Sequence, residues 1–288
     1  YSSLSTHHLL AASIIIPVFN NLHLTQQCLD SIFQNTTPGL YEVIVVDNGS
    51  TDGSREYLQS LEPRIRYIRN PGNLFFARGR NRGAWAARSA NLLFLNNDTV
   101  VTPGWLEAML EVLTQSPEIG IVGNKQLFPA SNPIYSGLVW HAGMTFTEQK
   151  DSWHVFFGFD ADHPAVNVQR DYPCVTGCCL LIRKSLFERL RGFDPWFQNG
   201  YEDTDLCLRA GQAGARIVYT PKSEIVHHVS ASESRFDRHI ANFLRFRERW
   251  AERIVPSEVS CYREAGLTAA GSPEQHSALS TQDSALST

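Results

Sequence analysis

Three acidic residues stand within four positions of the chain, at Glu202, Asp203 and Asp205. Carboxylates this close repel one another, and a helix N-terminus offsets only about 0.3–1 kcal/mol for each of them. A capped helix therefore accounts for one or two of these acids, but not comfortably for all three. The sharper interpretation is a carboxylate positioned as a general base, a role that typically raises a reaction rate about 10²–10⁴-fold.

A second polar group, Asn96, Asn97 and Asp98, follows the apolar run 91–95. Oxygen atoms at the end of a buried strand suit a hard divalent cation, although one carboxylate is few for a metal site made of protein alone. The phosphates of a bound nucleotide would supply further ligands. An ordinary capped turn before the next helix is the alternative.

Two adjacent histidines, His227 and His228, lie late in the chain. Adjacent residues of a strand point to opposite faces, so at most one of them should face a site shared with the other motifs. That histidine would ligate the metal or contact a phosphate. A structural role for both is the alternative.

Basic residues concentrate between Glu62 and Asp98, where the chain has no acidic residue. The arginines of this stretch are Arg64, Arg66, Arg69, Arg78, Arg80, Arg82 and Arg88. In a chain of net charge −4 they form a local positive field, and arginines mixed with glycines suit a diphosphate. Nucleic acid is the competing anion, but no RNP-like or helix-turn-helix pattern accompanies them. A solvated helix face is the other alternative.

Two turn-forming segments, 17–20 and 47–53, each follow an apolar run. In the second, Asn-Gly and Asp-Gly pairs let the backbone turn sharply and approach a ligand. Asp47 would accept hydrogen bonds from a nucleobase or a ribose hydroxyl. An ordinary strand-to-helix turn is the alternative.

The elements that hold these groups follow from hydrophobic patterning. Strands are expected at 13–18, 42–46, 65–68, 91–95, 119–122, 174–183 and 216–219. Helices are expected at 22–33, 76–88, 103–115, 185–190, 203–213 and 235–253, with Pro103 at the first position of its helix. The alternation of nearly uniformly apolar strands with helices predicts a doubly wound, mostly parallel α/β sheet with helices on both faces.

Ligands of such sheets bind beyond the carboxyl ends of the strands. Asp47 and Asp98 should therefore face one crevice, although they are far apart in sequence. The segment 128–173 loses the periodicity and scatters its aromatic and histidine residues. We expect it to be a long, partly mobile segment over the site.

The composition is that of a globular protein with one large domain or two small ones, because 43% of residues are hydrophobic and 19% charged. No apolar run reaches about 18 residues, so no membrane-spanning helix is expected. The six cysteines fit neither a paired zinc ribbon nor a dense disulfide framework, and we expect buried thiols in a reducing compartment.

Taken in order, these motifs resemble those of the family 2 glycosyltransferases. The resemblance extends from about residue 13 to residue 232 and rests on PVFN, VVDNGSTDGS, NPGN, ARGRNRG, LNNDT, GFD, GYEDTDLCLR and HHVSAS. It implies the Rossmann-like A-type glycosyltransferase fold and a nucleotide-sugar donor. It also implies a divalent cation, Mn²⁺ or Mg²⁺, and inversion at the anomeric carbon.

The resemblance also implies roles for individual residues. Asp203, in a pair with Glu202, looks like the catalytic base. Asp98 matches the last position of the family's DxD motif and would hold the metal with His227, or with His228 in its place. The donor-binding residues would be Pro17, Phe19, Asn20, Asp47, Asn48, Arg78, Asn81 and Asn97. Asn96 stands where DxD has its first acid, so the chain would bring one carboxylate fewer to the metal.

We therefore expect one catalytic domain at 13–255, with a nucleotide-binding half at 13–125 and an acceptor and catalytic half at 126–255. Residues 1–12 would be an N-terminal extension. Residues 266–288 contain no aromatic residue, lysine or arginine and would be a disordered tail. The chain would be a module of a longer protein or carry a flexible extension.

The expected reaction moves a sugar from a nucleotide diphosphate sugar to a hydroxyl of a saccharide or lipid-linked saccharide, in the synthesis of cell-surface polysaccharide or glycoconjugates. We expect it in the cytoplasm, free or at the inner face of the membrane, without a nucleic acid partner. A sugar nucleotidyltransferase is one alternative, but PVFN lacks its glycine-rich, basic signature. A catalytically silent carbohydrate-binding or scaffold domain is the other, although the acidic residues are intact.

Overall fold

The computed structural model of the 288-residue chain describes residues 10–229 and 239–267. Most of the extension expected at 1–12 and nearly all of the tail expected at 266–288 lie outside the described residues. The same holds for positions 235–238 of the expected helix 235–253. None of the helices in the described part is both long and apolar enough to cross a membrane.

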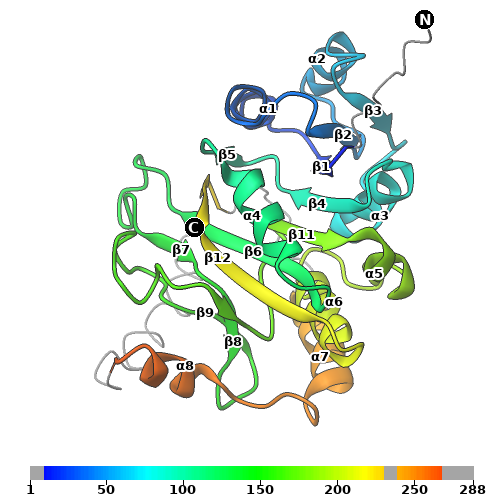
Figure 1. The fold of residues 1–288 in the computed structure, drawn as a ribbon. Coiled ribbons are helices and arrows are strands. Elements are labelled where there is room, and N and C mark those ends of the chain that lie inside the picture. Colours follow the sequence, from blue (N-terminus) through cyan, green and yellow to red (C-terminus); the bar gives the residue numbers. More distant parts are fainter. Residues whose placement is uncertain (1–9, 230–238, 268–288) are drawn as a thin grey trace, which may run out of the picture.

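A large sheet with the strand order β10–β12–β6–β11–β4–β1–β2–β3 runs through the described part (Figure 1). Its longer strands are β1 (Ala12–Val18), β2 (Tyr41–Asp47), β3 (Arg66–Arg69), β4 (Asn91–Leu95), β6 (Ile119–Leu127), β11 (Cys179–Arg183) and β12 (Arg216–His227). β1 to β4 pair in parallel, as do β6 and β12. The mostly parallel sheet is confirmed. β11 is antiparallel to both its neighbours, β4 and β6, which the sequence did not indicate.

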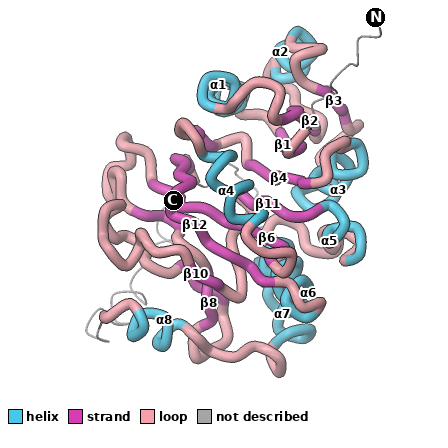
Figure 2. The backbone as a smooth tube through the Cα atoms, viewed as in Figure 1, coloured by secondary structure: helices cyan, strands magenta, loops and turns pink. Residues whose placement is uncertain are grey.

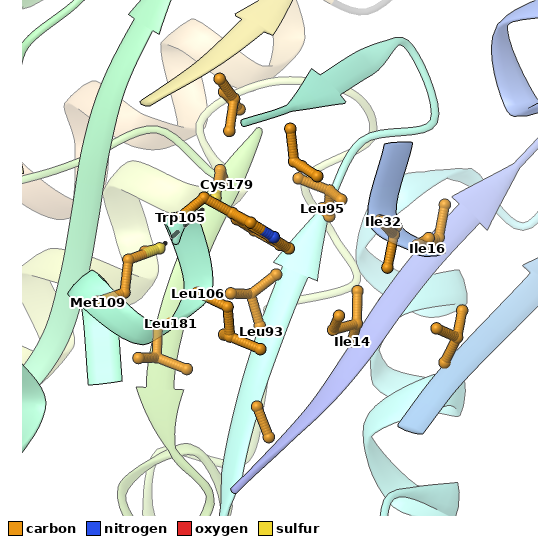
Figure 3. Close-up of a cluster of buried hydrophobic side chains, with 14 of the residues drawn as sticks. Ile14, Ile16, Ile32, Leu93, Leu95, Trp105, Leu106, Met109, Cys179 and Leu181 are labelled. Atoms are coloured by element: carbon orange, nitrogen blue, oxygen red, sulfur yellow. Dashed lines mark hydrogen bonds between the residues drawn. The ribbon is translucent and has the colours of Figure 1, made fainter. Parts of the chain in front are cut away.

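Helices cover both faces of this sheet, as predicted, because successive residues of each strand point to opposite sides. Ile14 and Ile16 of β1 belong to one core cluster, while Ile15 between them belongs to another. Figure 3 shows the first cluster, where Trp105 and Met109 pack near strand residues that include Leu93 and Leu181.

The first face carries α1 (Leu22–Asn35), α2 (Ser54–Ser60) and α4 (Trp105–Thr114). The second carries α3 (Phe75–Ala86), α5 (Lys184–Arg189), α6 (Glu202–Gln212) and α7 (His239–Trp250). α8 (Glu258–Glu264) follows and buries Cys261 against a third cluster.

The expected strands and helices exist, but several bounds differ. Pro103 does not begin its helix, because Gly104 caps α4 with a φ of 78° and the first helical residue is Trp105. Only the second half of the expected strand 174–183 is extended, because the residues before Cys179 form a turn at the sheet edge. β12 continues to His227, well past the expected end at 219, because it pairs first with β6 and then with β5 (Thr99–Val101).

The segment 128–173 contributes to the wall of the pocket, as expected, but it has more regular secondary structure than its sequence pattern indicated. This segment contains the short strands β7 (Val139–His141), β8 (Met144–Phe146), β9 (Ser152–His154) and β10 (Arg170–Asp171), shown in part in Figures 1 and 2. It also encloses the third core cluster, in which Phe156 and Val166 pack with Tyr219 of β12. Strands of two or three residues are too short to show a hydrophobic period, which is why the sequence pattern missed them.

Candidate active site

A pocket of about 500 Å³ opens along one edge of the sheet, beyond the carboxyl ends of β1, β2, β4 and β12. Among the residues singled out from the sequence, the pocket is lined by Pro17, Phe19, Asn48, Asn97, Asp98, Glu202, Asp203 and His227. Segments that are more than two hundred residues apart, such as those of Pro17 and His227, therefore meet at one site. This is where a doubly wound sheet is expected to bind its ligand.

Asp203 lies at the N-terminus of α6, and each of its carboxylate oxygens is held by a backbone amide. Oδ2 accepts a hydrogen bond from Gly177 N at 2.7 Å, and Oδ1 accepts one from Thr204 N at 2.7 Å. These bonds fix the carboxylate in the pocket and leave further acceptor positions on its oxygens. A Cβ atom at Gly177 would lie 2.7 Å from Arg80 Nη1 and 3.0 Å from Asp203 Cβ, so this close packing favours glycine.

Glu202, the neighbour of Asp203, is almost fully buried and is held from two sides. Its Oε2 accepts a 2.6 Å hydrogen bond from Gly200 N, and its Oε1 lies 3.5 Å from the guanidinium of Arg80. Burial, and then the negative charge of Asp203, raise the pKa of Glu202 above its ordinary value. The arrangement makes Glu202 a positioned neighbour of the better exposed Asp203.

Asp205, the third acid of the motif, does not line the pocket. It is completely buried and accepts hydrogen bonds from Arg209 and Arg249 at 2.7 Å and from the indole of Trp250 at 3.0 Å. It joins α6 to α7. The crowding of three acids therefore combines pocket-lining carboxylates with one structural carboxylate.

Asp98 and His227 form the second polar pair of the pocket. Asp98 Oδ1 lies 3.3 Å from His227 Nε2, and both side chains are nearly buried. The pairing of Thr99 with His227 brings the two residues together, because β5 runs antiparallel to the end of β12. Of the two histidines, His227 lines the pocket, whereas the backbone amide of His228 donates to the carbonyl of Asp98.

Asp47 does not line the pocket, in contrast to Asp98, so the expected shared crevice holds only one of these two acids. Its carboxylate is completely buried and accepts hydrogen bonds from Ser50 N at 2.7 Å, from the hydroxyl of Tyr67 at 2.8 Å and from Arg69. These bonds shape the turn that presents the next residue, Asn48, to the pocket.

Asn20, Asn81 and Arg78 also lie outside the lining of this pocket. Asn20 Oδ1 accepts from Thr51 N at 2.9 Å and so ties together the two turn-forming segments. The side-chain amide of Asn81 donates a hydrogen bond to the carbonyl of Phe193 at 2.8 Å and accepts one from the backbone amide of Phe193 at 2.9 Å. Arg78 lines a second cavity of about 380 Å³, beside Trp196 and α7.

Comparison with known protein families adds a separate observation. The model of the family described as glycosyl transferase family 2 matches residues 13–191. A second model, described as the N-terminal domain of galactosyltransferase, matches residues 158–232. The first match alone covers more than half of the chain and includes the motifs around Asp47 and Asp98.

The chain belongs to glycosyl transferase family 2.

Two of the relatives that this chain resembles have descriptive names. The O-antigen biosynthesis protein RfbC of Myxococcus xanthus is 34% identical over 76% of the chain and 17% of its own length. The N-acetylglucosaminyl-diphospho-decaprenol L-rhamnosyltransferase of Mycobacterium tuberculosis is 27% identical over 67% of the chain and 68% of its own length. The chain spans a quarter or less of the length of the first relatives it matches.

A solved structure shares the fold of this family 2 glycosyltransferase. The crystal structure of GalNAc-T7 with UDP, GalNAc and Mn²⁺ aligns over 85% of the chain and 49% of its own chain, with a TM-score of 0.66 and 17% identity. This neighbour has the A-type glycosyltransferase fold, which confirms the fold class expected from the sequence.

Arg80 also lines the pocket, although the sequence pattern gave it no role apart from the other arginines of its stretch. Arg80 is 2% exposed, and its Nη2 donates to Asn96 Oδ1 at 2.8 Å and to the carbonyl of Gly177 at 2.9 Å. Arg80 therefore touches three parts of the site: the turn after β4, the loop before β11 and Glu202. Arg78 and Arg80 are two residues apart on α3, so their side chains leave the helix on different faces.

Proposed function

We propose that this chain is an inverting glycosyltransferase that moves a sugar from a nucleotide diphosphate sugar to an acceptor hydroxyl. The observation that supports it best is the presence of Asp203 and the Asp98–His227 pair in one pocket at the carboxyl edge of the sheet. The family match favours this activity over a nucleotidyltransferase or a silent binding domain. The names of the relatives favour a place in cell-surface polysaccharide or glycoconjugate synthesis.

Asp203 is the proposed general base. Its oxygens are fixed by the amides of Gly177 and Thr204, so the carboxylate can accept the proton of an acceptor hydroxyl without having to reorient. The acceptor oxygen then forms its bond to the anomeric carbon while the bond to the diphosphate oxygen breaks. One displacement of this kind inverts the anomeric carbon.

Glu202 and Arg80 are proposed to position the base. Glu202 holds the Gly200 turn that precedes α6, and Arg80 holds the carbonyl of Gly177, whose own amide binds Asp203. The guanidinium of Arg80 also brings a positive charge into the pocket, where it would offset charge on the leaving diphosphate.

Asp98 and His227 are proposed to hold the divalent cation, Mn²⁺ or Mg²⁺. The 3.3 Å between Asp98 Oδ1 and His227 Nε2 is near the roughly 3 Å that separates neighbouring ligands of one octahedral ion, so the pair fits. The described residues offer no group of three such ligands, so the donor phosphates would complete the shell. A cation bound there would neutralise charge on the leaving diphosphate.

The nucleotide and sugar of the donor are proposed to contact Pro17, Phe19, Asn48 and Asn97, which line the pocket. Asp47, Asn20 and Asn81 would instead shape the turns and loops around it, through the hydrogen bonds described above. Arg78 stays a candidate for the donor's outer contacts, at the neighbouring cavity. The acceptor would be a saccharide or lipid-linked saccharide.

Replacing Asp203 with Asn tests the proposal. Release of nucleoside diphosphate from candidate nucleotide sugars, with acceptor present, should fall at least about 10²-fold because the base is lost. The affinity for nucleoside diphosphate, measured by calorimetry, should stay within about twofold. Asp160→Asn, an exposed acid of the same type, is the matched control. Unchanged turnover in Asp203→Asn would exclude Asp203 as the base.

A further inference from the structure

One wall of the pocket has no role in the proposed base, metal and donor sites. It is formed by Trp140 of β7 and by the β8–β9 hairpin, from which Met144, Ser152, Trp153 and His154 line the pocket. Met144 pairs directly with His154 across the hairpin, and side chains two positions apart on a strand share a face. We refer to Trp140, Met144, Ser152 and His154 as the hairpin wall.

Trp140 is a rigid aromatic surface. Its ring lies 5.4 Å from that of Phe128 and 5.6 Å from that of Phe157, measured between centroids. The centroid of the Trp140 ring also lies 4.9 Å from that of His154 and 6.2 Å from that of His227. The indole of Trp140 is thus supported by Phe128 and Phe157 and lies next to His227, one of the two proposed metal ligands.

His154 is held as a hydrogen-bond donor by a second, buried histidine. His141 Nε2 accepts from Gly143 N at 3.3 Å, so the hydrogen of the neutral His141 ring is on Nδ1. Nδ1 lies 2.9 Å from His154 Nδ1, which must accept that hydrogen. The neutral His154 ring then carries its own hydrogen on Nε2. The fixed tautomer gives the hairpin wall an N–H donor beside the indole.

The strand order places this wall away from the donor residues. Asn48 and Phe19 follow β2 and β1, whereas β7 pairs with β6 near the other end of the sheet. β4 and β11 lie between these ends, and the segments next to them carry Asp98 and Gly177, which binds Asp203. The pocket therefore continues past the proposed base and metal pair to the hairpin wall.

We infer that the hairpin wall is the acceptor subsite and that it takes a pyranose ring, an inference that rests on the proposed glycosyl transfer. A pyranose has an apolar face of C–H groups that packs on an aromatic ring, and hydroxyls that need fixed polar partners. Trp140 supplies the first, and His154 Nε2–H and the Ser152 hydroxyl supply the second. The sugar ring of the acceptor, rather than any lipid attached to it, is then what this wall recognises.

Binding of simple glycosides to the full chain tests this inference without turnover. Methyl glucoside, galactoside, mannoside, rhamnoside and N-acetylglucosaminide are titrated in the presence of Mg²⁺ and a nucleoside diphosphate, and saturation-transfer NMR reports contact with each. We expect at least one glycoside to bind, and its affinity to fall at least tenfold in His154→Gln and in Trp140→Leu.

Matched controls are His163→Gln and Trp85→Phe. His163 lies in the same segment but outside the pocket, and Trp85 is 56% exposed on α3. Both should bind the glycoside as the unaltered chain does. His154→Gln keeps the test usable if Trp140→Leu unfolds, because Trp140 also packs against Phe128 and Phe157.

The inference is overturned if no glycoside of the panel binds the unaltered chain, or if affinity in His154→Gln stays within twofold. Nucleoside diphosphate binding, measured on the same samples, separates this result from the proposed transfer. Loss of glycoside binding alone in the variants supports the hairpin wall. Failure of the unaltered chain to bind any nucleoside diphosphate would overturn the donor site and leave the glycoside result standing.

Discussion

The aspartates of this chain differ in function according to the groups that bind their carboxylates. Asp203 lines the pocket and is held by two backbone amides and, at longer distances, by the hydroxyls of Thr176 and Thr204. Asp47 and Asp205 are instead enclosed by arginines and aromatic side chains. The sequence placed all three in motifs of the predicted active site, because a motif shows the residue type but not the groups that bind it. Arg80 escaped notice for the same reason, since nothing in its neighbours along the chain separates it from the other six arginines of the stretch.

Asp98 and His227 should determine metal affinity together. Asp98→Asn and His227→Ala should each weaken Mn²⁺ binding at least about tenfold, because a contributing ligand is lost from a pair only 3.3 Å apart. Electron paramagnetic resonance of free Mn²⁺ in the presence of a nucleoside diphosphate measures this without turnover. His228→Ala is the control and should bind as the unaltered chain does. Equal weakening in all three variants would contradict the assignment of His227.

His141 should make the stability of the chain fall in mild acid. Burial, and then the charges of the nearby His154 and His227, hold its pKa well below the ordinary 6.5. The unfolded chain therefore binds a proton that the folded chain rejects, and stability is lost as pH falls below about 6.5. The contribution has a limiting slope of about 1.4 kcal/mol per pH unit.

Urea unfolding between pH 7.5 and 5, without metal, measures this slope. His141→Gln should flatten it, because glutamine cannot take up the proton, while His163→Gln should leave it unchanged. Parallel curves for His141→Gln and the unaltered chain would show that the slope comes from other groups.

Whole elements explain how well the fold followed from the sequence. Strands β1, β2 and β4 are mostly apolar because helices cover both faces, so their positions were predictable within about one residue. β6 continues past Val122 through the buried Asn124, Lys125 and Gln126, and no hydrophobic pattern could extend it there. The reversed direction of β11 was equally hidden, because an antiparallel strand between covered faces is as apolar as a parallel one.

The contact between α6 and α7 should depend on Asp205. Its carboxylate joins Arg209 on its own helix to Arg249 and Trp250 on α7. Asp205→Asn should lower the free energy of unfolding by about 3 kcal/mol, because it removes the buried partner of two charged groups. Urea unfolding checks this at neutral pH.

Glu248→Gln is the control on α7. Glu248 is largely exposed and pairs with Arg245 only at 3.5 Å, so its replacement should change the free energy of unfolding by less than about 0.5 kcal/mol. Similar losses in both variants would mean that α7 contributes through general surface charge rather than through Asp205.

The whole molecule brings its motifs together by strand order rather than by position along the chain. The pocket takes residues from the ends of β1, β2, β4 and β12, and the strand order spreads them along one edge of the sheet. The rule that such sheets bind ligands at their carboxyl edge was enough to predict a site there and to place Asp98 in it, but Asp47, predicted by the same rule, does not line the pocket. It was not enough to predict the hairpin wall, whose strands are too short for any pattern to reveal.

The reversed direction of β11 has one further consequence. A parallel strand in the position of β11 would place its carboxyl end at the pocket. Because β11 is antiparallel, the loop that precedes β11 lies at the pocket instead, and this loop contains the amide of Gly177. The orientation of Asp203 is therefore maintained in part by the main chain of this loop, at a position that packs closely on Asp203 and Arg80. A substitution that shifts the path of this loop would therefore turn the proposed base away from its orientation even where Asp203 itself is unaltered.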